Sequence, residues 1–247
     1  MDRKAALVTG ASSGIGTAVT GELSRQGYAV LAAGRDAART GALRDAAAGI
    51  ETWVGDITSA EACAALVAEC IARFGRLDLL VNNAGIYGHG TAEGTSDELW
   101  SQTIGINLSA PFYLSRAAMP HLRRARGAIV NVASDWGLVG GRDAVAYCAS
   151  KGGIVLMTRA MALDHAREGV RVNAVCPGDV ETPMLYRSGS EHGLDDAAAL
   201  SACNEESPTG RVTTADEVAA LVAYLAGDAA RQITGAAIPI DGGNTAG

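Results

Sequence analysis

Seven short apolar runs alternate along the chain with longer amphipathic stretches, and this alternation restricts the possible fold more than any other feature. The runs are nearly continuous in Val, Ile, Leu and Ala, as expected of strands buried on both faces of a sheet. They occupy residues 5–10, 28–34, 50–56, 77–85, 128–134, 170–178 and 236–243. Helical patterns lie between them at 14–26, 59–74, 109–124, 144–168 and 214–227. The alternation predicts an α/β fold, a doubly wound parallel sheet of seven strands with helices on both faces.

The length and the apolar content fit one domain. A chain of 247 residues with 48% hydrophobic residues can bury a single large core. We find no repeat, low-complexity run or linker, so we predict one domain over 1–247. One long segment, 183–213, interrupts the alternation, and we expect it to form a substrate lid of one or two short helices.

Charge and cysteine pattern exclude several classes of protein. The net charge of −7 argues against a nucleic-acid binder. No segment approaches the roughly 18 apolar residues of a membrane span, and the first residues lack the pattern of a signal peptide. The five cysteines have neither metal-binding nor disulfide spacing. We therefore expect a cytoplasmic protein with no metal site, no membrane contact and no nucleic-acid partner.

A glycine-rich turn follows the first apolar run. The stretch Thr9-Gly10-Ala-Ser-Ser-Gly14-Ile-Gly16 ends a predicted strand and opens a predicted helix. Glycines in this position allow a tight turn and a close approach of the backbone to a pyrophosphate, which the amide-rich helix N-terminus then faces. The turn therefore predicts a dinucleotide site.

The end of the second run indicates which dinucleotide is bound. In such folds an acid at this position binds the ribose 2′-hydroxyl of NAD, whereas an arginine accommodates the 2′-phosphate of NADP. Here Gly34 and Arg35 stand at that position. Asp36 could serve the ribose if the register shifted, but it is better explained as the N-cap of the next helix. Asp56, which ends the third run, could bind the adenine amino group.

Tyr147 and Lys151 lie four residues apart in a helical pattern and therefore on one face of that helix. An ammonium beside a phenol favours the phenolate, so we expect the pKa of Tyr147 to fall below its usual value of about 10. Such a tyrosine could exchange a proton with an alcohol near neutral pH.

Together these motifs resemble the short-chain dehydrogenase/reductase family over essentially the whole chain. The residues that carry the resemblance are the glycine-rich turn, Asn82-Asn83-Ala84-Gly85, Asn107 in INLSAPF, Ser134 in NVAS, Tyr147-x-x-x-Lys151, Pro177-Gly178-Asp-Val-Glu-Thr182 and the terminal IDGG. The resemblance implies a Rossmann-type fold. It also implies hydride transfer between a nicotinamide and a carbonyl or alcohol, and a homotetramer built partly from the helices at 109–124 and 147–168.

The family roles transfer onto matching positions of this chain. The resemblance implies that Tyr147 is the general acid/base, that Lys151 lowers its pKa and holds the nicotinamide ribose, and that Ser134 binds the reacting oxygen. It implies that Asn107 anchors a water that relays protons to Lys151. The expected cofactor-binding residues are Gly10, Ser12, Ser13, Gly14, Ile15, Gly16, Arg35, Asp56, Ile57, Asn83, Ala84, Gly85, Tyr147, Lys151, Pro177, Gly178, Val180 and Thr182.

The preferred cofactor is NADP(H), with NAD(H) still open. In the family a Gly–Arg pair after the second strand is typical of NADP(H). A second signal, a basic residue just before the middle glycine of the loop, is missing because Ser13 stands there.

The expected substrate is an uncharged, partly apolar or aromatic ketone or secondary alcohol. Candidate pocket residues follow the fourth run, follow Ser134 or open the predicted lid. They are Tyr87, His89, Trp136, Leu138, Met184, Leu185 and Tyr186.

Two other functions remain possible. One is reduction of a 3-oxoacyl thioester on an acidic carrier protein. Against it, two positions that are basic in carrier-dependent relatives are Ala128 and Glu168 here, and the lid is acidic. The other is a non-catalytic dinucleotide sensor, because fold alone does not fix function. Such a sensor could lose Tyr147 or Lys151, yet both are present.

Overall fold

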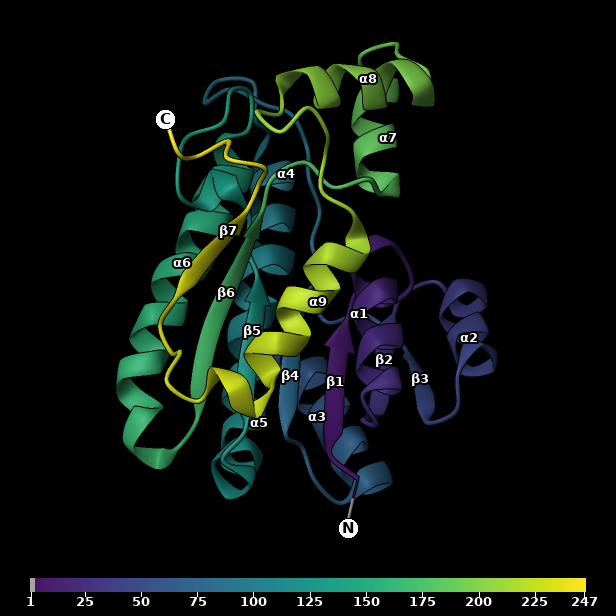
Figure 1. Cartoon of the computed structure of the whole chain (residues 1–247), viewed down its shortest axis with the longest axis vertical. Helices are drawn as coiled ribbons and strands as arrows, with labels where there is room; N and C mark the ends of the chain where they lie inside the picture. The colour runs from purple at the N-terminus through teal and green to yellow at the C-terminus, as the bar shows by residue number, and fades with distance from the viewer. Residues whose placement is uncertain (1–2) are drawn as a thin grey trace.

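The computed structural model describes residues 3–247. Its seven strands form one fully parallel sheet in the order β3-β2-β1-β4-β5-β6-β7 (Figure 1). This order confirms the predicted Rossmann-type fold, and each predicted apolar run contains one strand. The strands are β1 Ala5–Thr9, β2 Ala29–Gly34, β3 Ile50–Val54, β4 Leu79–Asn82, β5 Ala128–Val132, β6 Arg171–Pro177 and β7 Ala237–Ile240.

Helices cover both faces of the sheet (Figure 1). On one face α1 and α9 pack on each other and on the sheet, and on the other α3, α5 and α6 do so. The helices are α1 Gly14–Arg25, α2 Ala37–Ala46, α3 Ala60–Phe74, α4 Asp97–Ile104, α5 Ala110–Ala125, α6 Val145–His165, α7 Pro183–Glu191, α8 Asp196–Glu206 and α9 Ala215–Ala226.

Each face has its own apolar core. Leu23 of α1 and Val222 of α9 are fully buried against one face of the sheet. Leu66 of α3 and Leu114 of α5 are fully buried against the other. Full burial of a leucine or valine side chain stabilises a fold by about 1.5–3 kcal/mol, so the two layers hold the central strands firmly in place.

Two predicted helix starts are confirmed. The Asp36 carboxylate accepts a hydrogen bond from the Arg39 amide at the start of α2. Thr214 and Glu217 form a capping box at the start of α9, in which each side chain binds the backbone amide of the other residue. These side chains satisfy amides that the first helical turn leaves without partners.

Strands β1 to β3 are added toward one edge of the sheet and β4 to β7 toward the other, so the strand order changes direction between the neighbours β1 and β4. In open parallel sheets this reversal leaves a crevice at the carboxyl ends of the strands. The helices α7 and α8, which form the segment predicted as a lid, stand above those ends (Figure 1). Among the helices of residues 3–247, none combines the length and apolarity needed to cross a bilayer.

A network of buried hydrogen bonds joins the central strands β4 and β5 to each other and to the helices α5 and α6. Asn82 of β4 donates to Asn131 Oδ1 of β5 at 2.8 Å, and Asn131 Nδ2 donates to Thr158 Oγ1 of α6 at 2.8 Å. Asn82 also donates to Ser115 Oγ of α5 at 3.2 Å. Asn131 and Thr158 are fully buried, so water cannot replace a lost partner.

Replacing Asn131 with alanine should lower the free energy of unfolding by about 2–4 kcal/mol, because it removes one of the two acceptors of the buried Asn82 amide and the donor to the buried Thr158 hydroxyl. The control Thr158→Val keeps the side-chain shape and removes one partner, so its loss should be about half as large. Chemical denaturation measures both. Equal losses for the two variants would contradict this account of the network.

Candidate active site

A cleft of about 850 Å³ lies at the carboxyl ends of the strands. This volume is within the range of sites for small ligands and cofactors. Residues that follow β1 to β7 line it, together with the segment that holds α7 and α8. Most residues predicted for the cofactor and for catalysis meet here, including Arg35, Asp56, Ser134, Tyr147 and Lys151.

The glycine-rich turn between β1 and α1 forms one wall of the cleft. Gly10 and Gly14 have φ values of +62° and +52°. A residue with a side chain would be strained in this backbone conformation. A Cβ on Gly10 would lie 2.8 Å from the Ala84 backbone, and a Cβ on Gly16 would collide with the Gly10 carbonyl. Gly16 therefore packs beneath the turn rather than lining the cleft. The glycines leave the backbone open to a close-fitting group above the α1 N-terminus, so these residues fit a dinucleotide pyrophosphate.

Asn83 and Thr9 lock the end of β4 to the end of β1. Asn83 Nδ2 donates to the carbonyls of Thr9 and Gly10 at 3.0 and 3.1 Å. Thr9 Oγ1 accepts hydrogen bonds from the amides of Asn83 and Ala84, both at 3.1 Å. These bonds fix the distance between the glycine-rich turn and the backbone of residues 83–85, which lie next to each other in the cleft.

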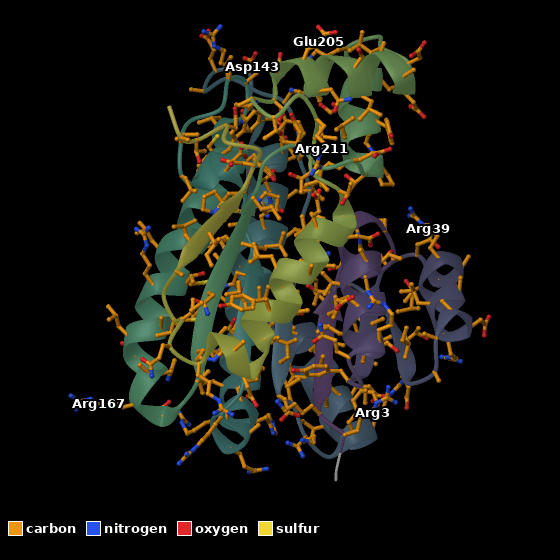
Figure 2. All side chains as sticks on the ribbon, in the orientation of Figure 1. Arg3, Arg39, Asp143, Arg167, Glu205 and Arg211 are labelled. Atoms are coloured by element: carbon orange, nitrogen blue, oxygen red, sulfur yellow. The ribbon has the colours of Figure 1, made fainter. Side chains whose placement is uncertain are left out.

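Arg35 stands exposed at the end of β2 and lines the cleft. Asp36 is engaged elsewhere, since its two oxygens accept from the Arg39 amide and from Arg39 Nε, each at 2.9 Å. These bonds to Arg39 lower the pKa of Asp36. Figure 2 labels Arg39 near the start of α2, and it too lines the cleft. The crevice beyond β2 is thus lined by two guanidinium groups, Arg35 and Arg39.

Asp56 lies in the same part of the cleft. Its Oδ1 accepts a hydrogen bond from the Thr58 amide at 2.6 Å. Bonds from Thr58 lower the pKa of Asp56, and the nearby charge of Arg35 contributes. Asp56 is therefore ionised at neutral pH and available as an acceptor.

Tyr147 and Lys151 come from the first two turns of α6 and face the cleft together. Lys151 Nζ donates to the Val132 carbonyl at 2.8 Å and lies 5.5 Å from the centre of the Tyr147 ring. Lys151 is only 4% exposed, so its ammonium has lost nearly all contact with bulk water. Both residues line the cleft wall beside the end of β5.

The electrostatics of this pair differ from the sequence-based expectation. We expected Lys151 to lower the pKa of Tyr147, but burial raises it above its usual value, against a smaller lowering by a hydrogen bond with Ser134. Burial also lowers the pKa of Lys151 to about 8. Desolvation outweighs charge attraction here because it disfavours both the phenolate and the ammonium.

Asn107 lies in a π-helical turn, Gly105–Ser109, between α4 and α5. π-helical turns are often found at functional sites. Asn107 Oδ1 accepts from the Ile86 amide at 2.8 Å, and Nδ2 donates to the Ile86 carbonyl and to Ser150 Oγ. Asn107 does not line the cleft itself; it ties the loop after β4 to α6, close to Lys151.

Ser134 follows β5 and makes contacts that the sequence did not indicate. Its hydroxyl donates to Asp135 Oδ1 at 2.8 Å, and its oxygen accepts from the Trp136 amide at 3.2 Å. The second oxygen of Asp135 accepts from Asn244 Nδ2 at 2.8 Å. Asn244 belongs to the last residues of the chain, which therefore reach into the site.

Four of the seven predicted substrate residues line the cleft, namely Tyr87, Trp136, Met184 and Leu185. The Tyr87 ring stands edge-on to the Tyr147 ring at 5.1 Å between centres, and the Trp136 ring lies 5.9 Å from that of Tyr87. This aromatic wall suits a flat or partly apolar ligand.

Three other predicted substrate residues do not line the cleft. Leu138 packs in a small apolar cluster with Ile154, and the Tyr186 hydroxyl donates to Glu181 at 2.9 Å. His89 lies behind Tyr87, whose hydroxyl is 3.0 Å from His89 Nδ1. His89 Nε2 is 3.2 Å from Ser188 Oγ of α7, so it joins the loop after β4 to α7.

Several cleft residues were missed in the sequence. They are Arg39, Asp135, Asp179, Arg187, Ser188, Cys203, Glu206, Ser207, Arg211, Asp241 and Asn244. An acid directly after the predicted serine could have indicated Asp135. Arg39 comes from the first turn of α2. The rest come from the segment after β6 and from the chain end, where no motif marks which side chains point inward; Arg211, labelled in Figure 2, lies just before α9. The described residues 3–247 hold no group of three or more His, Cys, Asp or Glu placed to bind a metal.

Comparison with known proteins agrees with this geometry. A family model described as enoyl-(acyl carrier protein) reductase matches residues 10–245. Meso-2,3-butanediol dehydrogenase of Serratia marcescens is 39% identical, over 99% of this chain and 96% of the relative. The 3beta-hydroxysteroid dehydrogenase of Mediterraneibacter gnavus is 37% identical, over 99% of this chain and 95% of the relative.

A solved structure has nearly the same fold. A variant of actinorhodin polyketide ketoreductase, solved with NADPH, superposes with a TM-score of 0.94 at 37% identity, covering 98% of this chain and 97% of that one. The protein is accordingly an NAD(P)-dependent oxidoreductase that interconverts carbonyl and alcohol groups. By its motifs, its fold and these similarities, the chain belongs to the short-chain dehydrogenase/reductase family.

Proposed function

We propose that the protein interconverts a small, uncharged ketone and a secondary alcohol with NADP(H), and that Tyr147 is the general acid/base. The observation that carries this proposal is the pairing of Tyr147 with the buried Lys151 on the cleft wall, next to Ser134. When bound, the nicotinamide supplies or accepts the hydride. The residues of the chain position the substrate oxygen and move its proton.

In the reducing direction Tyr147 donates its proton to the oxygen of the substrate carbonyl, and in the oxidising direction its phenolate takes the proton from the alcohol. Ser134 lies beside Tyr147 and holds the substrate next to it. Lys151 binds the nicotinamide ribose, and Asn107 positions a water that relays protons to Lys151. The positions of Asn107 and Lys151 support such a relay, because Asn107 Oδ1 and Lys151 Nζ both lie close to Gly85.

The segment after β6 would hold the nicotinamide ring. Pro177, Gly178, Val180 and Thr182 line the cleft on the side facing the glycine-rich turn. A Cβ on Gly14 would lie 2.9 Å from Thr182 Cγ2, so the two walls nearly touch there. This narrow place supports a role for Thr182 on the carboxamide of the ring.

The pH dependence should differ between the two directions. Because burial raises the pKa of Tyr147, the phenol is protonated across neutral pH and is ready to act as an acid. Reduction should therefore keep a constant kcat/KM between pH 6 and 7.5. Oxidation needs the phenolate, so its kcat/KM should rise by about tenfold per pH unit over the same range. Steady-state rates in buffers of constant ionic strength measure both.

The matched variant for this test is Tyr147→Phe, which keeps the ring and removes the hydroxyl. Turnover should fall by roughly 10²–10⁴-fold while cofactor binding survives. A reductive rate that falls between pH 6 and 7.5, or an active Tyr147→Phe protein, would contradict the assignment.

A 3-oxoacyl thioester is the second candidate substrate. Similarity to actinorhodin polyketide ketoreductase over 98% of the chain favours it. Against it, Glu168 at one expected docking position is paired with Arg123 at 2.9 Å and with His165, and Ala128 is buried in β5. The aromatic wall of the cleft fits a compact ketone better, so we rank the small ketone first.

The preference for NADP(H) rests on the charges around the end of β2. Arg35 and Arg39 both line the cleft there. Asp36 is bound by Arg39, so it is not available to accept a hydrogen bond from a ribose 2′-hydroxyl. A guanidinium fork binds a phosphate with two parallel hydrogen bonds, which favours the 2′-phosphate of NADP.

Replacing Arg35 with alanine should weaken NADPH binding by about 10–100-fold, because a charge-assisted hydrogen bond to a charged group contributes about 1.5–3 kcal/mol. NADH binding should change by less than about threefold. Titration followed by nicotinamide fluorescence measures both affinities. Lys4→Ala, far from the cleft, is the control and should change neither. Equal losses for the two nucleotides would refute a specific role for Arg35.

We also propose a homotetramer in the cytoplasm. Five large apolar side chains of α4, α5 and α6 are exposed: Trp100, Phe112, Val145, Leu156 and Leu163. Leu163 is 83% exposed, and with the other exposed apolar side chains of these helices it supports an interface on this part of the molecule. All five cysteines are free thiols, as expected in a reducing compartment.

Light scattering should give four times the mass of the chain. Leu163→Asp should lower this mass to that of a dimer or monomer, because it places a charge in an apolar interface. Leu194→Asp, between α7 and α8, changes an exposed leucine outside this surface and should leave the mass unchanged. A Leu163→Asp protein with the wild-type mass would exclude α6 from the interface.

A further inference from the structure

The helix α7 stands at the carboxyl edge of the sheet, beyond the helices that cover its two faces (Figure 1). Its buried residue Leu185 packs against α8. Within residues 3–247, the side-chain hydrogen bonds and ion pairs that join α7 to any residue outside 181–192 all involve His89. The polar attachment of α7 to the rest of the molecule therefore goes through one imidazole.

His89 contacts α7 with its Nε2 atom and with the edge of its ring. Nε2 lies 3.2 Å from Ser188 Oγ and 3.6 Å from Glu191 Oε2. The ring of His192, directly after α7, stands nearly perpendicular to the His89 ring, with 4.5 Å between the ring centres. Two polar partners and one aromatic partner thus join α7 to the loop after β4.

The loop that carries His89 is itself fixed on both sides of this residue. Ile86 exchanges two hydrogen bonds with Asn107, one through its amide and one through its carbonyl. The Gly90 amide donates to the Asp143 carbonyl at 2.7 Å. His89 therefore stands on a loop held by the body of the molecule, and α7 is attached to that loop.

The partners of His89 determine where the neutral imidazole carries its hydrogen. A carboxylate can only accept, so Glu191 favours the hydrogen on Nε2 of His89. Nδ1 is then an acceptor, and the Tyr87 hydroxyl, 3.0 Å away, donates to it. Tyr87 keeps this hydrogen because burial raises its pKa. The ring orientation that reaches α7 is therefore fixed by Tyr87.

Tyr87 also belongs to the wall of the cleft. Its ring centre lies 5.1 Å from that of Tyr147 and 5.9 Å from that of Trp136. A substrate bound beside Tyr147 therefore packs near a ring whose hydroxyl is held by His89. A continuous series of contacts runs from the reacting centre through Tyr87 and His89 to α7.

We propose that His89 is a positioning residue that couples the Tyr87 wall of the cleft to α7, so that α7 stays closed over the substrate only while Tyr87 holds the imidazole. His89 does not line the cleft, so it acts through its neighbours and not on the reacting atoms. A closed lid excludes water and retains the bound substrate. The effect on substrate binding rests on the proposed function, whereas the coupling itself does not.

Trypsin cleavage after Arg187 measures the opening of α7, because a helix must unfold locally before a protease can cut it. His89→Asn keeps an acceptor near the Nδ1 position for Tyr87 but is too short to reach Ser188. Cleavage should become about 3–10-fold faster, which is the effect of losing one hydrogen bond. Mass spectrometry of timed digests measures the rate.

Tyr87→Phe tests the coupling, because within residues 3–247 Tyr87 makes no hydrogen bond or ion pair to α7 itself. It should speed cleavage after Arg187 by a similar factor, and in the double variant with His89→Asn it should add nothing. The control Tyr224→Phe removes an exposed hydroxyl on α9 and should leave the rate unchanged. A wild-type rate in Tyr87→Phe, or additive increases in the double variant, would overturn the coupling.

Steady-state kinetics with NADPH and cyclohexanone give a second readout. His89→Asn should raise KM by about 3–10-fold, because α7 is closed for a smaller fraction of the time. It should change kcat by less than about twofold, because Tyr147 and its surroundings are intact. A lower kcat at unchanged KM would contradict a positioning role for His89.

Proteolysis needs no turnover, so the coupling and the proposed function can fail separately. Faster cleavage after Arg187 in both variants of a protein that reduces no ketone would support the coupling and refute the proposed function. Turnover of cyclohexanone by variants with the wild-type cleavage rate and KM would refute only the coupling. Cleavage after Arg167, labelled in Figure 2 at the opposite end of the molecule, is the internal reference for general unfolding.

Discussion

Parallel pairing of the seven strands is the constraint on which the site depends. Because every strand runs in the same direction, all carboxyl ends meet at one edge, and the residues that follow them are neighbours although they are far apart in sequence. The glycine-rich turn, Arg35, Asp56, Asn83 and Ser134 each begin within two residues of the end of a strand. The strands need helices on both faces to be buried, and α6, one of these helices, carries Tyr147 and Lys151 to the same edge.

Burial governs the chemistry of this edge more than charge attraction does. Lys151 binds the Val132 carbonyl and is nearly inaccessible, so its pKa falls to about 8. The same surroundings raise the pKa of Tyr147. A protonated phenol beside an ammonium that is still mostly charged at neutral pH is a ready acid for a carbonyl. The Lys151 ammonium would favour the Tyr147 phenolate, but it loses its charge as the pH rises through about 8. The raised pKa of Tyr147 means that the phenol ionises only above that pH.

The sequence was sufficient to predict the features that depend on local pattern, namely the positions of the strands and the starts of some helices. Short continuous apolar runs located all seven strands, and Asp36 and Thr214 marked the starts of two helices. The helix α4 was missed, although Ser96 caps it and acids fill its first turn, because it carries too short an apolar stripe to be recognised. The sign of the Tyr147 pKa shift was also missed, since burial depends on every element around the residue. Leu138 and Tyr186 follow the right motifs, yet their side chains turn into apolar packing and toward Glu181.

The contacts that define the substrate end could not be found from spacing at all. Asp135 and Asn244 are 109 positions apart, and His89 and Ser188 are 99 apart, yet each pair is within hydrogen-bond distance. No local pattern requires these contacts; they exist because the chain end and α7 both return to the carboxyl edge of the sheet. Dinucleotide binding uses strand ends, whose geometry the fold fixes. The cleft residues contributed by α7 and by the chain end, such as Ser188 and Asn244, lie outside the strand ends, and no local pattern in the sequence marks them.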